Sequence, residues 1–490
     1  MRIFLTIVLL LASAAVTAVS TAALPFYWDK SGEIEPLVWF TLALWILFAL
    51  AYFALRKVPK RAAIVLVIAG SVAIGGAAMA GPPNTSTDSA RYAWDGIVQN
   101  AGISPYEYVP ADPELAHLRT DWLFPEPVTD GDAGDGTGEP DCVGDRIMTV
   151  EVLPGEDPAT GPILCTTINR ATVPTIYPPT SELFFAGVRA LTGPDPQYMP
   201  MQVAGLLISL GVTGLLLRTL IATGRDPRWA ALWGWSPLVA TEGVTNSHID
   251  ILGAALLFGA TVLVASGRRW GGSIALGAAI AVKLIPVIGA PALLGKQPWK
   301  IILGSIAAFL LLYVPYILVS GVGVLGYLPG YLSEEGYESG SRFILLSPFF
   351  DGLVPVIIVA AVIAITAGLV WWKTDPANPW LGQLVMIGVV MLAVTPRYPW
   401  YALLLVPFVA MTGRWEWMAV PLALTERLLI PSADLARAFV WTTIVFIVAV
   451  TIRRMGPGGT RRILGAVPRT IGMYRNRKKA GSQLKTVTER

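Results

Sequence analysis

Residues 87–96 read TDSARYAWDG and follow directly on a hydrophobic segment. The stretch brings two carboxylates, Asp88 and Asp95, and one arginine, Arg91, to the point where a membrane span meets water. Together with Tyr92 they have i, i+3, i+4, i+7 spacing, so in a helix all four share one face. Such a face can hold acid–base and phosphate-binding groups, although a solvated juxtamembrane helix with an interface belt has a similar composition.

The composition excludes a soluble protein. Of the 490 residues, 54% are hydrophobic and only 14% are charged, and the mean hydropathy is +0.60. Chains this apolar are polytopic membrane proteins, because hydrophobic runs of about 20 residues span a bilayer as helices. We therefore expect an all-α polytopic membrane protein.

Charge is distributed unevenly along the chain, although the net charge is only +3. Residues 81–199 contain 18 Asp or Glu against 5 Arg and no Lys, whereas residues 453–490 contain 11 Lys or Arg and a single Glu. Basic segments stay on the cytoplasmic side of a membrane, near anionic headgroups. We therefore expect both termini in the cytoplasm and an extracytoplasmic 81–199 region, in a protein of the plasma membrane.

The two cysteines of the chain, Cys142 and Cys165, both lie in this acidic region. Disulfides form and persist in oxidising compartments. We expect a disulfide if the region faces outward, and the alternative is a pair of unlinked small side chains.

Roughly thirteen membrane segments account for the hydrophobic runs. The first resembles a signal peptide, but its apolar run is long, so we interpret it as an uncleaved signal anchor. Residues 271–294 have basic residues beyond both ends, which favours two short helices broken around Lys283 and Pro286 over one span. The segments cover residues 3–23, 37–55, 62–80, 203–221, 229–241, 249–265, 271–294, 301–319, 353–372, 380–395, 400–411, 415–429 and 435–452.

The Pro and Gly content of the large loop predicts short helices and irregular chain rather than an independent domain. Residues 181–191 are apolar but too short to span, so we expect them at the interface. The acidic run at 130–136 (DGDAGDG) lacks the ligand order of an EF-hand, which indicates a solvated loop.

The predicted chain has four parts: three N-terminal spans (1–80), an extracytoplasmic loop (81–199), a transmembrane bundle (200–452) and a basic cytoplasmic tail (453–490). We expect the tail to be partly disordered or to lie on the membrane.

Residues 242–250 (EGVTNSHID) form a second polar cluster, in a turn between two predicted spans. Ionisable groups at a membrane edge are costly unless they are paired or functional, so Glu242, His248 and Asp250 are candidate site residues. A hydrogen-bonded helix cap, made by Asn246 or Ser247, explains the same residues, and the two interpretations are compatible.

Two further polar positions stand out in the apolar half of the chain. Lys283 has apolar neighbours on both sides and needs an acidic or phosphate partner at membrane depth. Arg397 lies in residues 395–401 (TPRYPWY), on the predicted outer face, where the charge bias disfavours an arginine. Because arginine binds phosphate by two parallel hydrogen bonds, Arg397 is a candidate for holding a lipid-linked phosphate, whereas Trp400 and Tyr401 also fit an interface belt.

Motifs of several other function classes are missing from the sequence. It has no P-loop, no dinucleotide fingerprint, no CxxC and no HExxH. An outer site disfavours ATP or a nucleotide sugar from the cytosol. Nucleic-acid binding is not supported, because the basic residues belong to a membrane-surface tail, and no cofactor is implied.

In this order the motifs resemble bacterial, in particular actinobacterial, GT-C glycosyltransferases that use polyprenyl-phosphate sugars. Asp-x-x-Arg-Tyr-x-Trp-Asp-Gly at 88–96 is similar to the start of that family's first outer loop, although Thr87 stands where members often carry a second acid. The turn at 242–250 looks like the family's Glu…Gly-His-Asn-Asp element, but reads His-Ile-Asp. Further matches are residues 104–108 (SPYEY), Pro110, Asp112, Leu115, residues 177–179 (YPP), Lys283 and residues 399–401 (PWY).

The resemblance implies a GT-C-like bundle that transfers a sugar, mannose first and arabinofuranose next, from a polyprenyl-phosphate donor. The acceptor would be a hydroxyl of a glycolipid or cell-wall glycan at the extracytoplasmic face. Asp88 would be the general base of an inverting displacement, and cations would hold the leaving phosphate without an essential metal. Residues expected to bind substrate are Arg91, Tyr92, Trp94, Asp95, Tyr106, Tyr177, Glu242, His248, Asp250, Lys283, Arg397, Trp400 and Tyr401.

Two other function classes are consistent with the same residues. A transporter or flippase for a lipid-linked or small polar solute also explains a helix broken at Pro286 and a buried Lys283, but it predicts internal repeats, and no convincing repeat is present. A non-catalytic partner of a cell-wall synthase predicts that Asp88 and Arg397 lie far apart.

Overall fold

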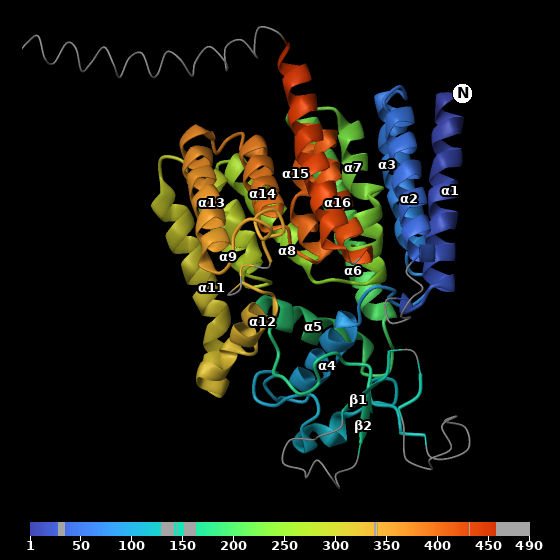
Figure 1. Ribbon diagram of the computed structural model, residues 1–490, viewed down its shortest axis with the longest axis vertical. Coiled ribbons are helices and arrows are strands. Elements are labelled where there is room, and N and C mark those ends of the chain that lie inside the picture. Colours follow the sequence, from blue (N-terminus) through green and yellow to red (C-terminus); the bar gives the residue numbers. More distant parts are fainter. Residues whose placement is uncertain are drawn as a thin grey trace, which may run out of the picture. The chain divides into compact units, whose positions relative to one another are not determined.

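The computed structural model describes residues 1–27, 35–128, 142–144, 146–150, 163–337, 340, 342–430 and 432–456. The chain divides into two compact units, Met1–Val440 and Trp441–Arg490. Within the described ranges, seven helices are long and apolar enough to cross a membrane, or eight if one bent pair counts as a span. The predicted all-α polytopic membrane protein is thereby confirmed (Figure 1).

Three long helices, drawn in blue in Figure 1, open the chain: α1 (Arg2–Ala23), α2 (Glu35–Leu55) and α3 (Lys60–Ala77). α1 packs against both α2 and α3, and α3 packs in turn against α6. The later long helices are α6 (Met199–Ala222), α8 (Asp250–Ala265), α9 (Arg269–Ile280), α11 (Pro298–Ser320), α13 (Leu353–Lys373), α14 (Trp380–Val394) and a final helix over Ala433–Gly456.

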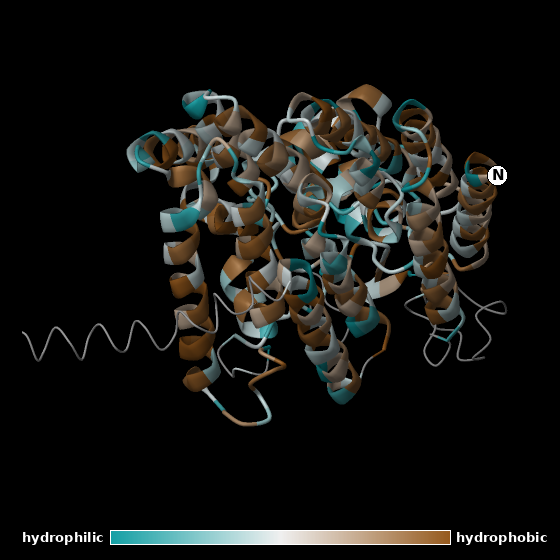
Figure 2. Ribbon diagram, turned by 90° about the horizontal axis from the view of Figure 1, so that it is seen from above, coloured by the Kyte–Doolittle hydropathy of each residue, from teal (hydrophilic) through white to brown (hydrophobic). Residues whose placement is uncertain are grey.

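Helix surfaces carry the apolar residues that a bilayer requires. Many large hydrophobic side chains are exposed, among them Phe4 on α1, Leu311 on α11 and Ile357 on α13. Figure 2 shows the hydrophobic residues, in brown, along these helices. An exposed apolar surface of this extent fits contact with lipid rather than with water.

The predicted break in residues 271–294 is present. α9 ends at Ile280, and the chain continues through a 3₁₀ helix, η5 (Ile285–Gly289), into α10 (Pro291–Leu294). Pro286 and Pro291 lack the amide hydrogen that a continuous helix needs, so each begins a new short helix.

Several predicted spans are instead series of short helices, so the predicted number of about thirteen exceeds the number of long helices. The reason is that hydropathy does not distinguish a lipid-facing segment from one buried in protein, and residues 400–411 are buried throughout. The short elements are η3 (Pro227–Ala230), α7 (Ala231–Gly234) and η4 (Val239–Thr245) at 229–241; η7 (Pro399–Leu404) and α15 (Val406–Thr412) at 400–411; and η8 (Trp415–Met418) and α16 (Ala419–Leu429) at 415–429.

The described residues of the 81–199 region gather at one end of the helices, with α4 (Asp88–Asn100) packed on α5 (Pro179–Thr192) (Figure 1). Gly96 makes this packing possible, because a Cβ there would collide with the carbonyl group of Phe185. The short helices were predicted, and residues 181–191, which were expected at the interface, belong to α5. The region also contains the 3₁₀ helix η2 (Pro113–Leu118), while η6 (Gly321–Leu325) and α12 (Leu328–Glu334) follow α11.

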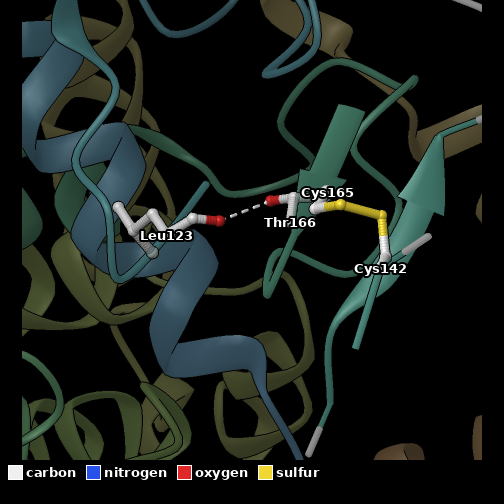
Figure 3. The surroundings of a disulfide bond; sticks show 4 residues. All are labelled: Leu123, Cys142, Cys165 and Thr166. Carbon is white, nitrogen blue, oxygen red and sulfur yellow. Dashed lines mark hydrogen bonds between the residues drawn. A yellow bond between two sulfur atoms is a disulfide. The ribbon is translucent and has the colours of Figure 1, made fainter. Parts of the chain in front are cut away.

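A two-stranded sheet in this region was not predicted. β1 (Met148–Val150) pairs antiparallel with β2 (Leu164–Thr166), with Thr149 opposite Cys165. Cys165 forms the expected disulfide with Cys142, and the Thr166 hydroxyl donates to the carbonyl of Leu123 at 2.8 Å (Figure 3). The hairpin is therefore tied to the rest of the loop. The acidic run at 130–136 and the tail beyond residue 456 lie outside the described residues.

Candidate active site

A cavity of about 540 Å³ lies between the α4 end of the loop region and the helices. Its polar wall contains Asp88, Arg91 and Asn169, and Lys283 and Tyr401 line it from the bundle. Another wall is apolar and is built from η5, α12 and α14. A pocket that combines a few converging polar groups with an apolar wall is typical of a binding site for an amphipathic ligand.

Asp88 is the first residue of α4, and its side chain is 20% exposed. Its Oδ1 accepts a hydrogen bond from the Asn169 side chain at 2.8 Å, and its Oδ2 lies 3.5 Å from Nδ1 of His248. Burial raises the pKa of Asp88, but the charge of the nearby His248 and the Asn169 hydrogen bond outweigh it and hold the pKa below its usual range. Asp88 is therefore ionised and faces the cavity.

His248 connects Asp88 to a second carboxylate. The ring is completely buried, and its Nε2 lies 3.3 Å from Oε2 of Glu242. The turn that carries it passes through Ser247, whose φ of 54° lies in the left-handed region that side chains rarely adopt. The predicted turn thus supplies an imidazole between two carboxylates.

The turn also holds the segment that precedes Asp88. The side-chain oxygen of Asn246 accepts hydrogen bonds from the backbone amides of Asn84 at 3.0 Å and Thr85 at 3.1 Å. The Thr245 hydroxyl donates to the carbonyl of Ala78 at 2.7 Å. Asn246 therefore connects two distant parts of the chain, and these contacts fix Asp88 relative to His248.

Lys283 occupies the gap between α9 and η5. Its ammonium group lies 3.0 Å from Oδ2 of Asp250 and 4.6 Å from the centre of the Tyr401 ring. Asp250 is 1% exposed at its side chain, whereas Lys283 is 24% exposed and lines the cavity. The acidic partner that a lysine at this depth needs is thus supplied by the 242–250 turn.

Arg91 follows Asp88 by one helical turn and also lines the cavity. Its Nε lies 2.8 Å from Oδ1 of Asp95, and its Nη1 donates to the carbonyl of Val173 at 3.1 Å. Nη2 is buried without a hydrogen-bond partner in the described part of the chain. Arg91 therefore has a donor left for a ligand.

Three aromatic rings stack in a column beside these groups. His248 and Trp400 have ring centres 3.6 Å apart, and Trp400 and Tyr398 have theirs 4.5 Å apart, both in stacked orientation. Thr395, at the start of this segment, has φ of 44°, an uncommon conformation for a β-branched residue. The column fixes the plane of the His248 ring and presents Trp400 and Tyr398 to the cavity.

Several residues predicted to bind substrate do not line the cavity. Trp94 is 1% exposed and packs on Phe124, so its ring belongs to the loop core and is not open to the cavity. Tyr92, which stacks on Phe185, and Tyr106, whose hydroxyl donates to the Tyr177 carbonyl at 2.5 Å, are buried as well, so substrate binding by these three residues stays a prediction that the cavity does not support. Aromatic burial in the loop core accounts for them. Four other predicted residues lie behind the cavity wall and contact the residues that line it. Asp95 pairs with Arg91, and Asp250 pairs with Lys283. His248 lies between Glu242 and Asp88.

Arg397 is exposed, and the cavity lining includes its neighbours Pro396 and Tyr398 but not Arg397 itself. Tyr177, Trp400 and Tyr401 do line the cavity, so their predicted role in substrate binding stays a prediction that the cavity is consistent with. Asp88 and Tyr398, the chain neighbour of Arg397, line the same cavity. In the described ranges, no group of three His, Cys, Asp or Glu side chains is placed to hold a metal ion.

Among the polar residues of the cavity wall that sequence reasoning missed are one asparagine, Asn169, and three arginines, Arg146, Arg170 and Arg342. Asn169 and Arg170 follow the second cysteine by a few residues, but nothing in their local pattern marks them as site residues. Only the folding of the loop back onto α4 brings Asn169 to Asp88.

A comparison with protein families finds one match, to the model of glycosyltransferase family 87, over residues 175–396. No curated protein and no solved structure matches the chain. The matched segment is less than half of the chain; it includes His248 and Lys283 and excludes Asp88. Together with the polytopic fold, this similarity to glycosyltransferase family 87 supports a membrane glycosyltransferase.

Proposed function

We propose that the chain transfers a sugar from a polyprenyl-phosphate donor to the hydroxyl of a glycolipid or cell-wall glycan. Mannose is the first candidate and arabinofuranose the second. The observation that carries the proposal is the ionised carboxylate of Asp88, which faces one cavity together with Lys283, Arg91 and an apolar wall. The sugar of such a donor fits beside Asp88, its phosphate beside Lys283 and Arg91, and its polyprenyl chain along the apolar wall.

The reaction is a single displacement with inversion. The acceptor oxygen attacks the anomeric carbon of the sugar, the bond from that carbon to the phosphate oxygen breaks, and the electron pair leaves with the phosphate. Asp88 takes the proton of the acceptor hydroxyl. Base catalysis of this kind contributes about 100-fold to 10,000-fold to the rate.

Lys283 and Arg91 stabilise the leaving phosphate, on which negative charge grows in the transition state. Each is held by an internal carboxylate, at 3.0 Å for Lys283 and 2.8 Å for Arg91, so each cation is in place before substrate arrives. Preorganised cations avoid reorganisation during the reaction. This set of groups requires no metal ion.

The apolar wall receives the polyprenyl chain. It includes Ile285 and Val287 on η5 and Val390 and Val394 on α14, which line the same cavity as Lys283. A chain in this groove leaves its phosphate beside the lysine. The site then lies at the extracytoplasmic face of the plasma membrane, with both termini in the cytoplasm, as the charge distribution favours.

The experiment follows transfer of labelled sugar from polyprenyl phosphate by purified Asp88→Asn protein. We expect kcat to fall by at least about 100-fold with little change in donor binding, because the amide cannot take the proton. Asp121→Asn removes an exposed carboxylate from the same loop and should turn over normally. Near-normal turnover by Asp88→Asn removes Asp88 from the base role, and lipid transport without any transfer by the wild type contradicts the function itself.

A further inference from the structure

A second, much smaller cavity has Glu242 in its wall. Its volume is about 20 Å³, and residues of α1, α2, η4 and α16 surround it together with the segment that precedes Asp88. Thr85 and Leu428 line both this cavity and the main one, so the two cavities lie next to each other. The small cavity is therefore part of the surroundings of the candidate active site.

Three polar atoms from the wall residues are buried without a hydrogen-bond partner in the part of the chain that the structure describes. They are Nε1 of Trp45, Oδ1 of Asn84 and Oγ1 of Thr85. Each of the three residues is no more than 9% exposed. A buried polar group without a partner is costly, and three of them around one small cavity indicate that they share a ligand.

Glu242 contributes a fourth polar group to this cavity. Its carboxylate lies 3.3 Å from Nε2 of His248 and accepts a hydrogen bond from the Asn246 side chain at 3.4 Å, and both contacts use Oε2. Within the described ranges, Oε1 is left for another donor. One oxygen of Glu242 thus holds His248, while the other is available to the ligand of the cavity.

The size of the cavity and the chemistry of its wall identify this ligand. An indole N–H is only a donor, which disfavours a cation, and a carboxylate is only an acceptor, which disfavours an anion. A cavity of on the order of 10–15 Å³ holds one water molecule, whereas a pocket for an organic ligand measures roughly 300 Å³ or more. The ligand is therefore water.

Water also matches the donors and acceptors of the wall in number. Its oxygen can accept hydrogen bonds from the indole of Trp45 and the hydroxyl of Thr85. Its two hydrogens can be donated to Oδ1 of Asn84 and Oε1 of Glu242. One water molecule with four hydrogen bonds thus leaves none of these four groups without a partner.

We propose that this cavity binds a water molecule that holds Glu242 in place, and that Trp45 is a positioning residue for the reaction. The inference rests on the proposed function, in which Asp88 is the base, and deepens it. The connection runs from Trp45 through the water to Oε1 of Glu242, and from Oε2 through His248 to Asp88. Without the water, the carboxylate of Glu242 is held through one oxygen only and orients His248 less firmly.

The first test is an experimental density map of the full chain in detergent, at a resolution that shows ordered water. We expect one water molecule within hydrogen-bond distance of Nε1 of Trp45 and Oε1 of Glu242. A cavity without ordered water in this map overturns the proposal. Because water binding requires no turnover, a map that shows the water while transfer fails means that the proposed function is wrong and the water site stands.

The second test measures sugar transfer by Trp45→Phe protein, which keeps an aromatic ring but lacks the N–H donor. We expect kcat to fall by about 3-fold to 10-fold with little change in the donor KM, because one hydrogen bond of the connection is lost. Trp233→Phe is the matched control. It also removes a buried indole, whose N–H donates to the carbonyl of Ser209 at 3.0 Å, but Trp233 lines neither cavity, so kcat should stay at the wild-type value.

A double variant separates positioning from a general loosening of the helices. In His248→Gln protein the connection from Glu242 to Asp88 is already broken, so adding Trp45→Phe should lower kcat no further. If the two losses multiply instead, or if Trp45→Phe and Trp233→Phe lose kcat equally, Trp45 does not act through His248 and the proposed role is overturned.

Discussion

Nδ1 of His248 lies 3.5 Å from Oδ2 of Asp88, while Nε2 of the same ring lies 3.3 Å from Oε2 of Glu242. One imidazole thus connects a carboxylate on the cavity wall with a carboxylate buried behind it. Trp400 stacks on the imidazole at 3.6 Å and prevents it from tilting away. His248 therefore acts as a positioning residue, which orients Asp88 through one nitrogen and is itself oriented through the other.

Replacing His248 should lower turnover without abolishing substrate binding. Glutamine has similar polarity but cannot reach two carboxylates through a rigid ring, so Asp88 loses its orientation. We expect His248→Gln to reduce kcat by about 10-fold to 100-fold, with the donor KM changed much less. Labelled-sugar transfer by the purified variant measures both constants.

The chain offers a matched control, because its other histidine, His117, is exposed on η2. His117→Gln should have wild-type constants. Equal loss in both variants, or a fall in affinity without a fall in kcat for His248→Gln, would show that His248 does not act through Asp88.

Asn169 and His248 should together set the pH at which kcat/KM begins to fall on the acid side. Burial raises the pKa of Asp88, but the charge of the nearby His248 and the hydrogen bond from Asn169 lower it further than burial raises it. A carboxyl with a lowered pKa stays ionised at pH values below its ordinary range, and the stability that ionisation contributes is lost only as the pH falls through the folded pKa. The wild-type kcat/KM should therefore show no loss from Asp88 near pH 5.

Asn169→Ala removes the hydrogen bond to the Asp88 carboxylate and should raise the pKa of Asp88. The acid limb of kcat/KM then moves toward higher pH, while the plateau at neutral pH changes less. A profile of Asn169→Ala that coincides with that of the wild type across the acid range would contradict the role of Asn169.

The site residues that the sequence predicts best are charged residues in apolar surroundings. Asp88, Lys283 and the 242–250 turn stand out because an ionisable group near a bilayer is costly unless it has a partner or a function. The structure supplies that partner for Lys283, namely Asp250. The local sequence is enough to find these residues, because the free-energy cost of an ionisable group in apolar surroundings depends on its immediate neighbourhood.

Residues in the loop could not be sorted in the same way. Trp94 faces a core that contains Phe124, and Tyr92 faces Phe185, although Tyr92 shares the helix spacing of Asp88 and Arg91. Which side of a short helix meets protein depends on long-range packing, as does the approach of Asn169 to Asp88. Likewise, hydropathy located the apolar segments near 400 and 415 but did not show that protein, not lipid, surrounds them.

The Lys283–Asp250 pair should matter for folding as well as for activity. Lys283→Met leaves Asp250 buried without its partner at 1% exposure, which we expect to cost about 3 kcal/mol of unfolding free energy. Lys283→Met/Asp250→Asn removes the uncompensated charge, so stability should largely return. Denaturation in detergent measures the first effect.

A transfer assay distinguishes the role of Lys283 in folding, where it neutralises Asp250, from its role in catalysis. The double variant still lacks the cation beside the cavity, so transfer should stay low although the protein is folded. Recovery of both stability and turnover in the double variant would show that Lys283 serves only to neutralise Asp250.

The disulfide should stabilise the hairpin that leads to Asn169. Cys142 and Cys165 are 23 residues apart, and closing a loop of this length contributes about 3 kcal/mol by restricting the unfolded chain. Asn169 comes three residues after β2, and the Thr166 hydroxyl anchors that strand to Leu123.

In Cys142→Ser/Cys165→Ser protein, we expect faster proteolysis within residues 142–170 and a several-fold lower kcat/KM, since Asp88 loses its hydrogen-bond donor Asn169 whenever the hairpin opens. Limited proteolysis and transfer assays of the oxidised wild type, the reduced wild type and the serine variant check this, and reduction should reproduce the serine variant. If the hairpin resists protease equally in all three while activity still falls, the disulfide acts on the site by some route other than holding Asn169.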